Sequence, residues 1–331
     1  MIIHKNGVKN MRFYVLLCCV TAAALILTPA ITLPNGLRDG TDVSSAVDEE
    51  KTITVFLSAE DASVTLPMTE YLVGAVSAEM PASYHPQALM AQAVACHTYA
   101  LYRRAQESRS PTASLGGADL SDQPQVHQGY LSETDRREKW GDAFTENEEK
   151  VRQAVEAVRT KIITYDGNAV CAAFFAVSSG QTESAKTVFG DDIPYLQSVS
   201  SDSDLLSPAC TQSVVFSEAE FSECAQKLDG VFLSEDADDW VGEQKNTDSG
   251  FVEEITVGGK TVSGNTFRNA FSLRSAVFTV ARTESGFRIQ TKGYGHLVGM
   301  SQYGADAMAQ DGADYQQILQ HYYSGVTIDD E

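Results

Sequence analysis

The sequence predicts an α+β fold: one extracytoplasmic body of mixed helices and short antiparallel strands with a cleft, behind a single N-terminal transmembrane helix. Apolar and polar residues alternate over short runs such as residues 52–57, which is typical of strands. Residues 86–101 instead repeat apolar side chains at helical spacing. One long apolar segment, residues 13–33, stands apart near the N-terminus and is long enough to cross a bilayer.

The charges around the apolar segment indicate its orientation. Lys5, Lys9 and Arg12 precede residues 13–33, and no basic residue follows them closely. This asymmetry places the N-terminus in the cytoplasm and the rest of the chain outside the membrane. A cleaved signal peptide with its apolar part at residues 13–27 is the alternative.

Three regions are therefore expected along the chain. Residues 1–34 form a cytoplasmic tip and membrane anchor, residues 35–51 a polar linker, and residues 52–331 a folded domain. The chain has 45 acidic and 24 basic side chains, a net charge of −21. Nucleic acid is not expected as a partner, because phosphate binding needs a basic face. An uncharged or weakly charged polymer fits this surface better than a strongly anionic one.

The elements of the folded domain follow from periodicity and turn residues. Strands are expected at residues 52–57 and 63–66, and Pro86 opens a long helix because proline is tolerated in a first helical turn. The later elements are a polar excursion at 106–139, an amphipathic helix at 147–159, strands within 161–177, a helix at 218–228, hairpins over 251–262 and 278–291, and helices at 301–309 and 314–323. A loop as long as the excursion is often functional.

The cysteines beyond the apolar segment fall into two groups. Cys96 and Cys171 lie in apolar patterns and are expected to be buried thiols. Cys210 and Cys224 flank a polar stretch. Outside the cytoplasm the environment is oxidising, so a disulfide between these two cysteines is compatible with the sequence. None of the cysteine pairs has the spacing of metal ligands.

Glu79 is the candidate catalytic acid. Ala78, Met80 and other apolar neighbours surround it, and such a setting favours the protonated carboxyl group. An acid of this kind can donate a proton near neutral pH. The alternative is a carboxylate that closes a turn or caps the next helix. On that helix, Gln92 and Tyr99 fall on one face and are expected to point into the cleft that holds Glu79.

Residues 293–304 form the second informative stretch, because glycines surround His296, Ser301, Gln302 and Tyr303. Glycines let the backbone approach a ligand closely, and histidine, glutamine and tyrosine side chains are suited to hold a sugar. The alternative is a glycine-rich turn with a buried, hydrogen-bonded histidine.

A third group, Ser178, Ser179 and Thr182, follows an apolar strand. Its hydroxyl groups either line the same cleft or terminate the strand. No nucleophile elbow, phosphate-binding loop or histidine-rich metal motif occurs in the sequence, and no metal is expected.

Several of these stretches, in this order, resemble the stage II sporulation protein D family, which carries the SpoIID/LytB domain. The similar segments, within residues 52–329, are YLVGAVSAEMP, LMAQAVACHTYAL, AVSSGQTES, SGNTFRNAFSLRS and GYGHLVGMSQYGADAMA. The resemblance implies a membrane-anchored lytic transglycosylase of sporulating bacteria. Such an enzyme cleaves the β-1,4 bond between N-acetylmuramic acid and N-acetylglucosamine in peptidoglycan strands stripped of stem peptides, during engulfment of the forespore.

The resemblance also implies a role for Glu79, the glutamate of the family's AEMP motif, as the catalytic acid. Ordinary glycosidases need two carboxylates. In a lytic transglycosylase the 6-hydroxyl group of the muramic acid attacks its own anomeric carbon, so one carboxylate serves as acid and then base. The product is a 1,6-anhydro sugar.

The sequence departs from the family pattern at four positions. Met90 and His97 stand where many members have lysine and arginine, and Ser121 and His127 stand where some members carry a zinc-binding cysteine pair. A structural zinc is therefore not expected, and no cofactor is expected.

The family further implies peptidoglycan glycan strands and the engulfment proteins SpoIIP and SpoIIM as partners. It implies a place in the cell membrane, with the folded domain in the intermembrane space on the mother-cell side. Two alternatives stay open: a non-catalytic wall-binding protein that modulates amidases, and a hydrolase that pairs Glu79 with Glu183 or Asp191.

Overall fold

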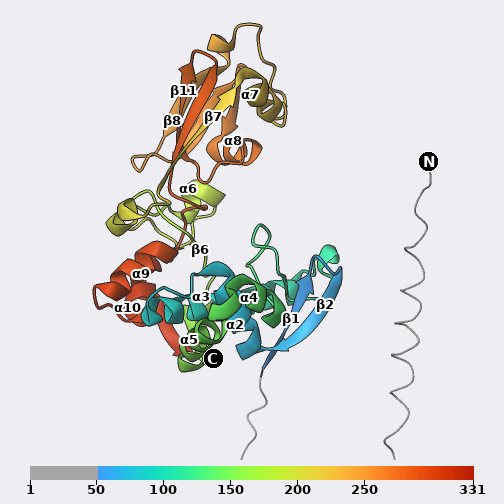
Figure 1. The fold of residues 1–331 in the computed structure, drawn as a ribbon, viewed down its shortest axis with the longest axis vertical. Coiled ribbons are helices and arrows are strands. Elements are labelled where there is room, and N and C mark those ends of the chain that lie inside the picture. The colour runs from blue at the N-terminus through green and yellow to red at the C-terminus, as the bar shows by residue number, and fades with distance from the viewer. Residues whose placement is uncertain (1–50) are drawn as a thin grey trace, which may run out of the picture. The chain divides into compact units, whose positions relative to one another are not determined.

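The computed structural model describes residues 51–331 (Figure 1). The anchor expected at residues 13–33 and nearly all of the linker expected at residues 35–51 lie outside this part of the chain. Within the described part, no helix has the length and apolar character of a membrane span. Helices and short, mostly antiparallel strands make up one compact unit within residues 51–331, as the α+β prediction requires.

The domain begins with the two predicted strands and an unpredicted helix. Strands β1 (Thr52–Leu57) and β2 (Ala62–Pro67) pair antiparallel, and β3 (Leu120–Ser121) pairs parallel to β1. Helix α2 (Met68–Glu79) follows β2 directly. Most of its side chains are buried, so apolar residues occur on all sides of the helix and no amphipathic period marks it in the sequence.

Helix α3 (Pro86–Arg109) confirms the helix expected to begin at Pro86. The Nδ1 atom of His85 accepts a hydrogen bond from the main chain of Gln87 at 3.3 Å and caps the first turn. The next segment differs from the predicted excursion of residues 106–139, because α3 continues through its first residues and helix α4 (Glu133–Trp140) occupies its last ones. Helix α5 (Phe144–Ala157) contains most of the expected amphipathic helix.

Two small sheets and two helices combine segments from the middle and the end of the chain. Strand β4 (Lys161–Tyr165) lies between β5 (Asn168–Ala169) and β14 (Thr327–Asp330), and β6 (Phe174–Phe175) pairs parallel to β13 (Met300–Ser301). Helices α9 (Gln302–Gln310) and α10 (Tyr315–Tyr322) follow β13. The predicted capping box of Asp314 and Gln317 is present at the start of α10.

The remaining elements form two three-stranded sheets with helices beside them. One sheet has the order β11 (Val277–Thr283), β12 (Gly286–Lys292), β7 (Thr211–Ser217), and the other has the order β10 (Lys260–Ser263), β9 (Val252–Val257), β8 (Val241–Asn246). The helices are α6 (Ala185–Phe189), α7 (Glu218–Ala225) and α8 (Gly264–Ala270). The predicted hairpins and the helix at residues 218–228 are thus confirmed.

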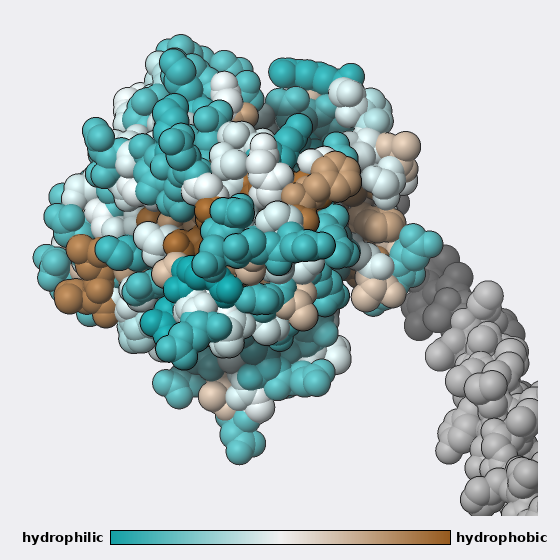
Figure 2. All heavy atoms as spheres, turned by 90° about the horizontal axis from the view of Figure 1, so that it is seen from above, coloured by the Kyte–Doolittle hydropathy of each residue, from teal (hydrophilic) through white to brown (hydrophobic). Residues whose placement is uncertain are grey.

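The described residues build two large apolar cores. The first takes side chains from residues 53–196 and again from residues 298–326, whereas the second lies within residues 221–289. Figure 1 shows β7, β8, β11, α7 and α8 grouped around the second core. The chain therefore leaves the first core before β7 and returns to it after β12. Figure 2 shows a mainly hydrophilic surface with small, separate hydrophobic patches, in keeping with the acidic composition.

The cysteines are free thiols throughout the described residues. Cys96 is buried as predicted, and Cys171 is half-buried, with a pKa that burial raises to about 11. The disulfide considered for Cys210 and Cys224 is not formed: Cys210 is buried in the structure, and its Sγ donates to the carbonyl oxygen of Ser178 at 3.7 Å.

Candidate active site

Glu79 is the last residue of α2, and the sequence after it explains why the helix ends there. A residue that precedes proline is disfavoured in the helical conformation, and Met80 precedes Pro81. Met80 is accordingly extended, with φ −124° and ψ 141°. The proline therefore places Glu79 at the C-terminal end of a helix, where the helix dipole disfavours a negative charge.

A main-chain amide from a distant loop holds the carboxylate of Glu79. The nitrogen of Gly129 donates to Oε1 of Glu79 at 2.5 Å. A Cβ atom at position 129 would lie 3.0 Å from that oxygen and 3.0 Å from the Cβ of Ala78. A side chain at this position would push its neighbours apart by a few tenths of an ångström, so glycine favours the close approach. Gly129 was not predicted from the sequence as a site residue. Its signal was indirect: it lies in the excursion that was expected to be functional because of its length.

Residues 128–131 lie against α2 at several points. The main-chain nitrogen of Leu131 donates to the oxygen of Gly74 at 3.2 Å, and a Cβ at Gly74 would collide with the ring of Tyr130. The rings of Tyr71 and Tyr130 stack with centroids 5.8 Å apart. The side chain of Gln128 donates to the hydroxyl group of Tyr71. The loop that carries Gly129 is thus fixed along the helix that carries Glu79.

Arg136 holds this loop through a hydrogen bond to its main chain, and the side chain of Arg136 has no exposed surface. Its Nη1 donates to the oxygen of Leu131 at 2.9 Å. Its Nη2 lies 2.8 Å from Glu70 of α2, and its Nε lies 2.8 Å from Glu148 of α5. The guanidinium group therefore joins the loop and two helices in one charged network.

Gln302 brings a second part of the chain to the acid. It is the first residue of α9, and its Nε2 donates to Oε1 of Gln92 at 3.4 Å. Its side chain also lies close enough to Glu79 to lower the pKa of that carboxyl group. The structure thus brings together Glu79, Gln92 and Gln302, three of the site residues expected from the sequence. Ser301 lies beside them but accepts from the nitrogen of Gly304 at 3.2 Å, which caps α9.

The surroundings of Glu79 favour its protonated form. Burial raises the pKa of Glu79 above its ordinary value. The hydrogen bond from Gly129 and the side chain of Gln302 lower this pKa, as does the positive charge of Lys139, but together they do not cancel the effect of burial. The raised pKa is what a proton donor near neutral pH requires.

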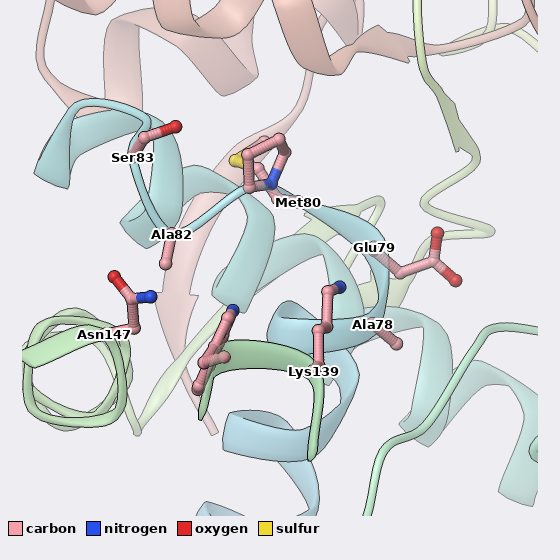
Figure 3. A pocket seen from close by; sticks show the side chains of 9 residues that line it. Ala78, Glu79, Met80, Ala82, Ser83, Lys139 and Asn147 are labelled. Atoms are coloured by element: carbon pink, nitrogen blue, oxygen red, sulfur yellow. The ribbon is translucent and has the colours of Figure 1, made fainter. Parts of the chain in front are cut away.

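An open hollow of about 420 Å³ lies beside the acid. In Figure 3, Glu79 lies at one side of the hollow, and its carboxylate points away from Ser83 and Asn147 on the other side. Lys139 lies between Glu79 and Asn147 in this view. Trp140 also lines the hollow. Lys139 and Trp140 were not predicted as site residues, because they lie on α4, a short, highly charged helix in a segment expected to be a loop.

Tyr99 lies near the acid and beside a second tyrosine. Its ring centroid is 6.5 Å from that of Tyr102, and the side chain is half-buried. Burial raises the pKa of Tyr99, and the negative charge of Glu79 adds a smaller effect in the same direction. Tyr99 is therefore a neutral group close to Glu79.

The hydroxyl residues after β6 make contacts within the protein. The main-chain N–H of Ser178 donates a hydrogen bond to Oδ2 of Asp204 at 2.7 Å. Oγ1 of Thr182 accepts a hydrogen bond from the main-chain nitrogen of Val199 at 2.9 Å. The Oγ atom of Ser179 is buried, with no partner among residues 51–331. In the described part of the chain, no hydrogen bond or ion pair joins these three residues to Glu79.

His296 and Tyr303 also make contacts within the protein. The ring of His296 packs against those of Phe175 and Phe189, with centroid distances of 5.7 and 5.6 Å. Burial lowers the pKa of His296 to about 4, so the ring is neutral at pH 7. The main-chain N–H of Tyr303 donates a hydrogen bond to the carbonyl oxygen of Ala176 at 3.1 Å. This bond joins the start of α9 to the segment after β6.

The two candidate second carboxylates differ in their surroundings. Glu183 is buried and accepts a hydrogen bond from Ser249, and burial raises its pKa. Asp191 is exposed. Neither of them is joined to Glu79 by a hydrogen bond within residues 51–331.

The positions at which some family members hold zinc lie side by side. The main-chain nitrogen of Ser121 donates to Nδ1 of His127 at 3.0 Å. Burial lowers the pKa of His127 to about 4. Among residues 51–331, no group of three or more histidine, cysteine or acidic side chains could hold a metal ion.

Comparison with known proteins places these features in a family. Residues 58–165, which include Glu79, Gly129 and Lys139, match the model of the stage II sporulation protein family. Stage II sporulation protein D of Bacillus subtilis is 33% identical over 96% of both chains. The protein of the same name from Bacillus amyloliquefaciens is 37% identical over 83% of this chain and 78% of its own length.

A more distant relative has a different description. The amidase enhancer of Bacillus subtilis is 26% identical over 78% of this chain, and the match covers 40% of that longer protein. The two sporulation proteins match at higher identity and over most of their length. On these similarities, the chain belongs to the stage II sporulation protein D family.

Proposed function

We propose that the chain is a lytic transglycosylase that cleaves the glycan strands of peptidoglycan, with Glu79 as general acid and base. The observation that carries the proposal is the setting of Glu79: a half-buried carboxyl group with a raised pKa, held by the amide of Gly129 at the edge of an open hollow. Gln302 and Gln92 extend this setting with side-chain amides suited to hold a sugar.

The chemistry needs one titrating group. The protonated Glu79 donates its proton to the oxygen that bridges N-acetylmuramic acid and N-acetylglucosamine, and the bond from that oxygen to the anomeric carbon breaks. The 6-hydroxyl group of the same muramic acid then forms a bond to the anomeric carbon, and its proton passes to the ionised Glu79. The products are a 1,6-anhydro end and a free 4-hydroxyl group, and the enzyme returns to its protonated state.

The test uses the full chain and glycan strands freed of stem peptides, with the products identified by mass spectrometry. We expect 1,6-anhydro ends, and we expect Glu79→Gln to lower their rate of formation by about 10² to 10⁴, the usual contribution of a general acid. Glu138→Gln is the matched control, because Glu138 is an exposed acid on neighbouring α4. Equal rates for the Glu79→Gln variant and the unmodified chain would refute the proposal.

A second candidate function rests on the amidase enhancer among the relatives. In that case the chain binds the wall and increases the activity of an amidase without cutting the strand. The same incubation separates the candidates. Anhydro ends support the transglycosylase and reducing ends support a hydrolase that uses Glu183 or Asp191. Intact strands, together with faster cleavage by an added wall amidase, support the modulator.

The cellular setting belongs to the same proposal. We place the chain at the cell membrane, anchored through residues 13–33, with residues 52–331 as the catalytic domain in the intermembrane space on the mother-cell side. The names of the two sporulation relatives support a role in sporulation. SpoIIP and SpoIIM are the proposed partners, and co-purification from sporulating cells, with and without residues 13–33, tests both the anchor and the partners.

A further inference from the structure

The hollow beside Glu79 has the groups of a sugar subsite. Its volume of about 420 Å³ lies within the range of ligand pockets in proteins. Trp140 is half-buried, and its aromatic ring provides apolar surface in the lining of the hollow. Ser83 and Asn147 add a hydroxyl group and a side-chain amide to the same lining. This combination of one aromatic ring with polar side chains suits an N-acetylated sugar.

Lys139 is the basic residue in this lining, and Glu79 is the acidic one. The Nζ atom of Lys139 donates to the main-chain oxygen of Ser77 at 2.8 Å. This contact satisfies a carbonyl group near the C-terminal end of α2. An ammonium group has three N–H donors, so this bond leaves two of them for other partners.

Lys139 is exposed, and within residues 51–331 no ion pair holds its charge. Burial lowers the pKa of Lys139, and the negative charge of Glu79 acts in the opposite direction. Glu79 provides that negative charge only when it is ionised, whereas the proposed reaction begins with Glu79 protonated. At that stage no anion of the site faces the ammonium group, and a carboxylate on a ligand in the hollow would supply one.

We propose that Lys139 binds the carboxylate of an acidic amino sugar that occupies this hollow. The sugar is an N-acetylhexosamine with a carboxylate on a short ether arm, as muramic acid has once its peptide is removed. The proposal rests on the proposed function, because it concerns the same site. When a peptide is attached, the carboxylate becomes an uncharged amide and the ion pair cannot form. Lys139 is therefore a residue that determines specificity for peptide-free strands.

The test measures binding rather than cleavage. The full chain with Glu79→Gln is titrated by calorimetry with two synthetic tetrasaccharides of alternating N-acetylglucosamine and N-acetylmuramic acid. The two differ only in the lactyl group, a free carboxylate in one and a methylamide in the other. We expect the acid to bind about tenfold more tightly, the size of one favourable charged contact. Adding Lys139→Met should reduce this ratio to about one, whereas Lys139→Arg should keep most of it.

A control lysine and the two ligands make the result specific. Lys260→Met, at an exposed position on β10, should leave the ratio unchanged. A ratio that survives Lys139→Met overturns the proposal, and so does an equal loss of affinity for both ligands, because the charge then has no separate effect. If the ratio depends on Lys139 but the unmodified chain makes no anhydro product, the subsite stands and the proposed function fails.

Discussion

The main-chain nitrogen of Gly129 lies 2.5 Å from Oε1 of Glu79, although 50 positions separate the two residues in the sequence. The contact orients the carboxyl group from outside its own helix. The loop reaches this position because Gly74 and Gly129 both lack a Cβ atom where the loop meets α2. The acid is therefore positioned by backbone packing as well as by its own side-chain rotamer.

Substitution of Gly129 by alanine should lower activity more than stability. The new methyl group would lie 3.0 Å from Oε1 of Glu79, so the loop and the carboxyl group must move apart by a few tenths of an ångström. A misplaced catalytic group can cost up to about 10²-fold in rate, and we expect a loss of roughly 10- to 100-fold in kcat. Val126→Ala is the control, because Val126 is an exposed residue of the same loop. Unchanged kcat for Gly129→Ala would mean that this amide does not position the acid.

The stability of the protein should depend on pH through Glu79. Its pKa in the folded state is raised above the ordinary value of 4.5. The folded state therefore holds this proton more tightly than the unfolded state, and the associated stabilisation is complete below pH 4.5. It is lost as the pH rises from 4.5 through the raised value. Glutamine does not titrate, so the melting temperature of Glu79→Gln should increase relative to the unmodified chain across this window. A constant difference in thermal melts from pH 4 to pH 8 would contradict the raised pKa.

Removal of the buried guanidinium group of Arg136 should destabilise the fold strongly. Arg136→Met removes the buried one of the two cations that Glu70 and Glu148 share, and Arg152, which is 39% exposed, remains beside both. Loss of one partner from a buried ion pair costs about 3 to 5 kcal/mol, and we expect the lower end of this range because Arg152 remains. Its neighbour Arg137 is the matched control, because it is 60% exposed and pairs with Glu133 on the same helix. Arg137→Met should cost less than about 1 kcal/mol. Urea denaturation measures both values, and similar losses for the two variants would rule out this role for Arg136.

Local sequence signals predicted the elements that carry them. Pro86 begins α3, and Asp314 and Gln317 form the capping box of α10. The hairpin turn expected at Gly258 joins β9 and β10. These features depend on interactions between neighbours in the chain, so the sequence shows them directly. The helical repeat also predicted the face on which Gln92 lies, and Gln92 contacts Gln302 on that face.

Other features depend on contacts between distant residues. Helix α2 is buried on most sides, so its apolar residues show no helical period. Gly129 and Lys139 gain their places beside Glu79 only when the loop and α4 pack on α2. His97 stands where many family members have arginine, and its Nε2 atom lies 2.9 Å from a carboxylate oxygen of Glu331. No local pattern connects positions so far apart.

The separation of Gly129 and Glu79 has a consequence for the time at which the protein can act. A chain that has not folded has an ordinary glutamate at position 79, exposed to water and ionised at neutral pH. Burial in the folded protein raises the pKa of this carboxyl group, and its neighbours Gly129 and Gln302 come from distant parts of the chain. A partly unfolded polypeptide therefore lacks a carboxyl group with a raised pKa at this position, and the proposed proton donor exists only in the folded protein.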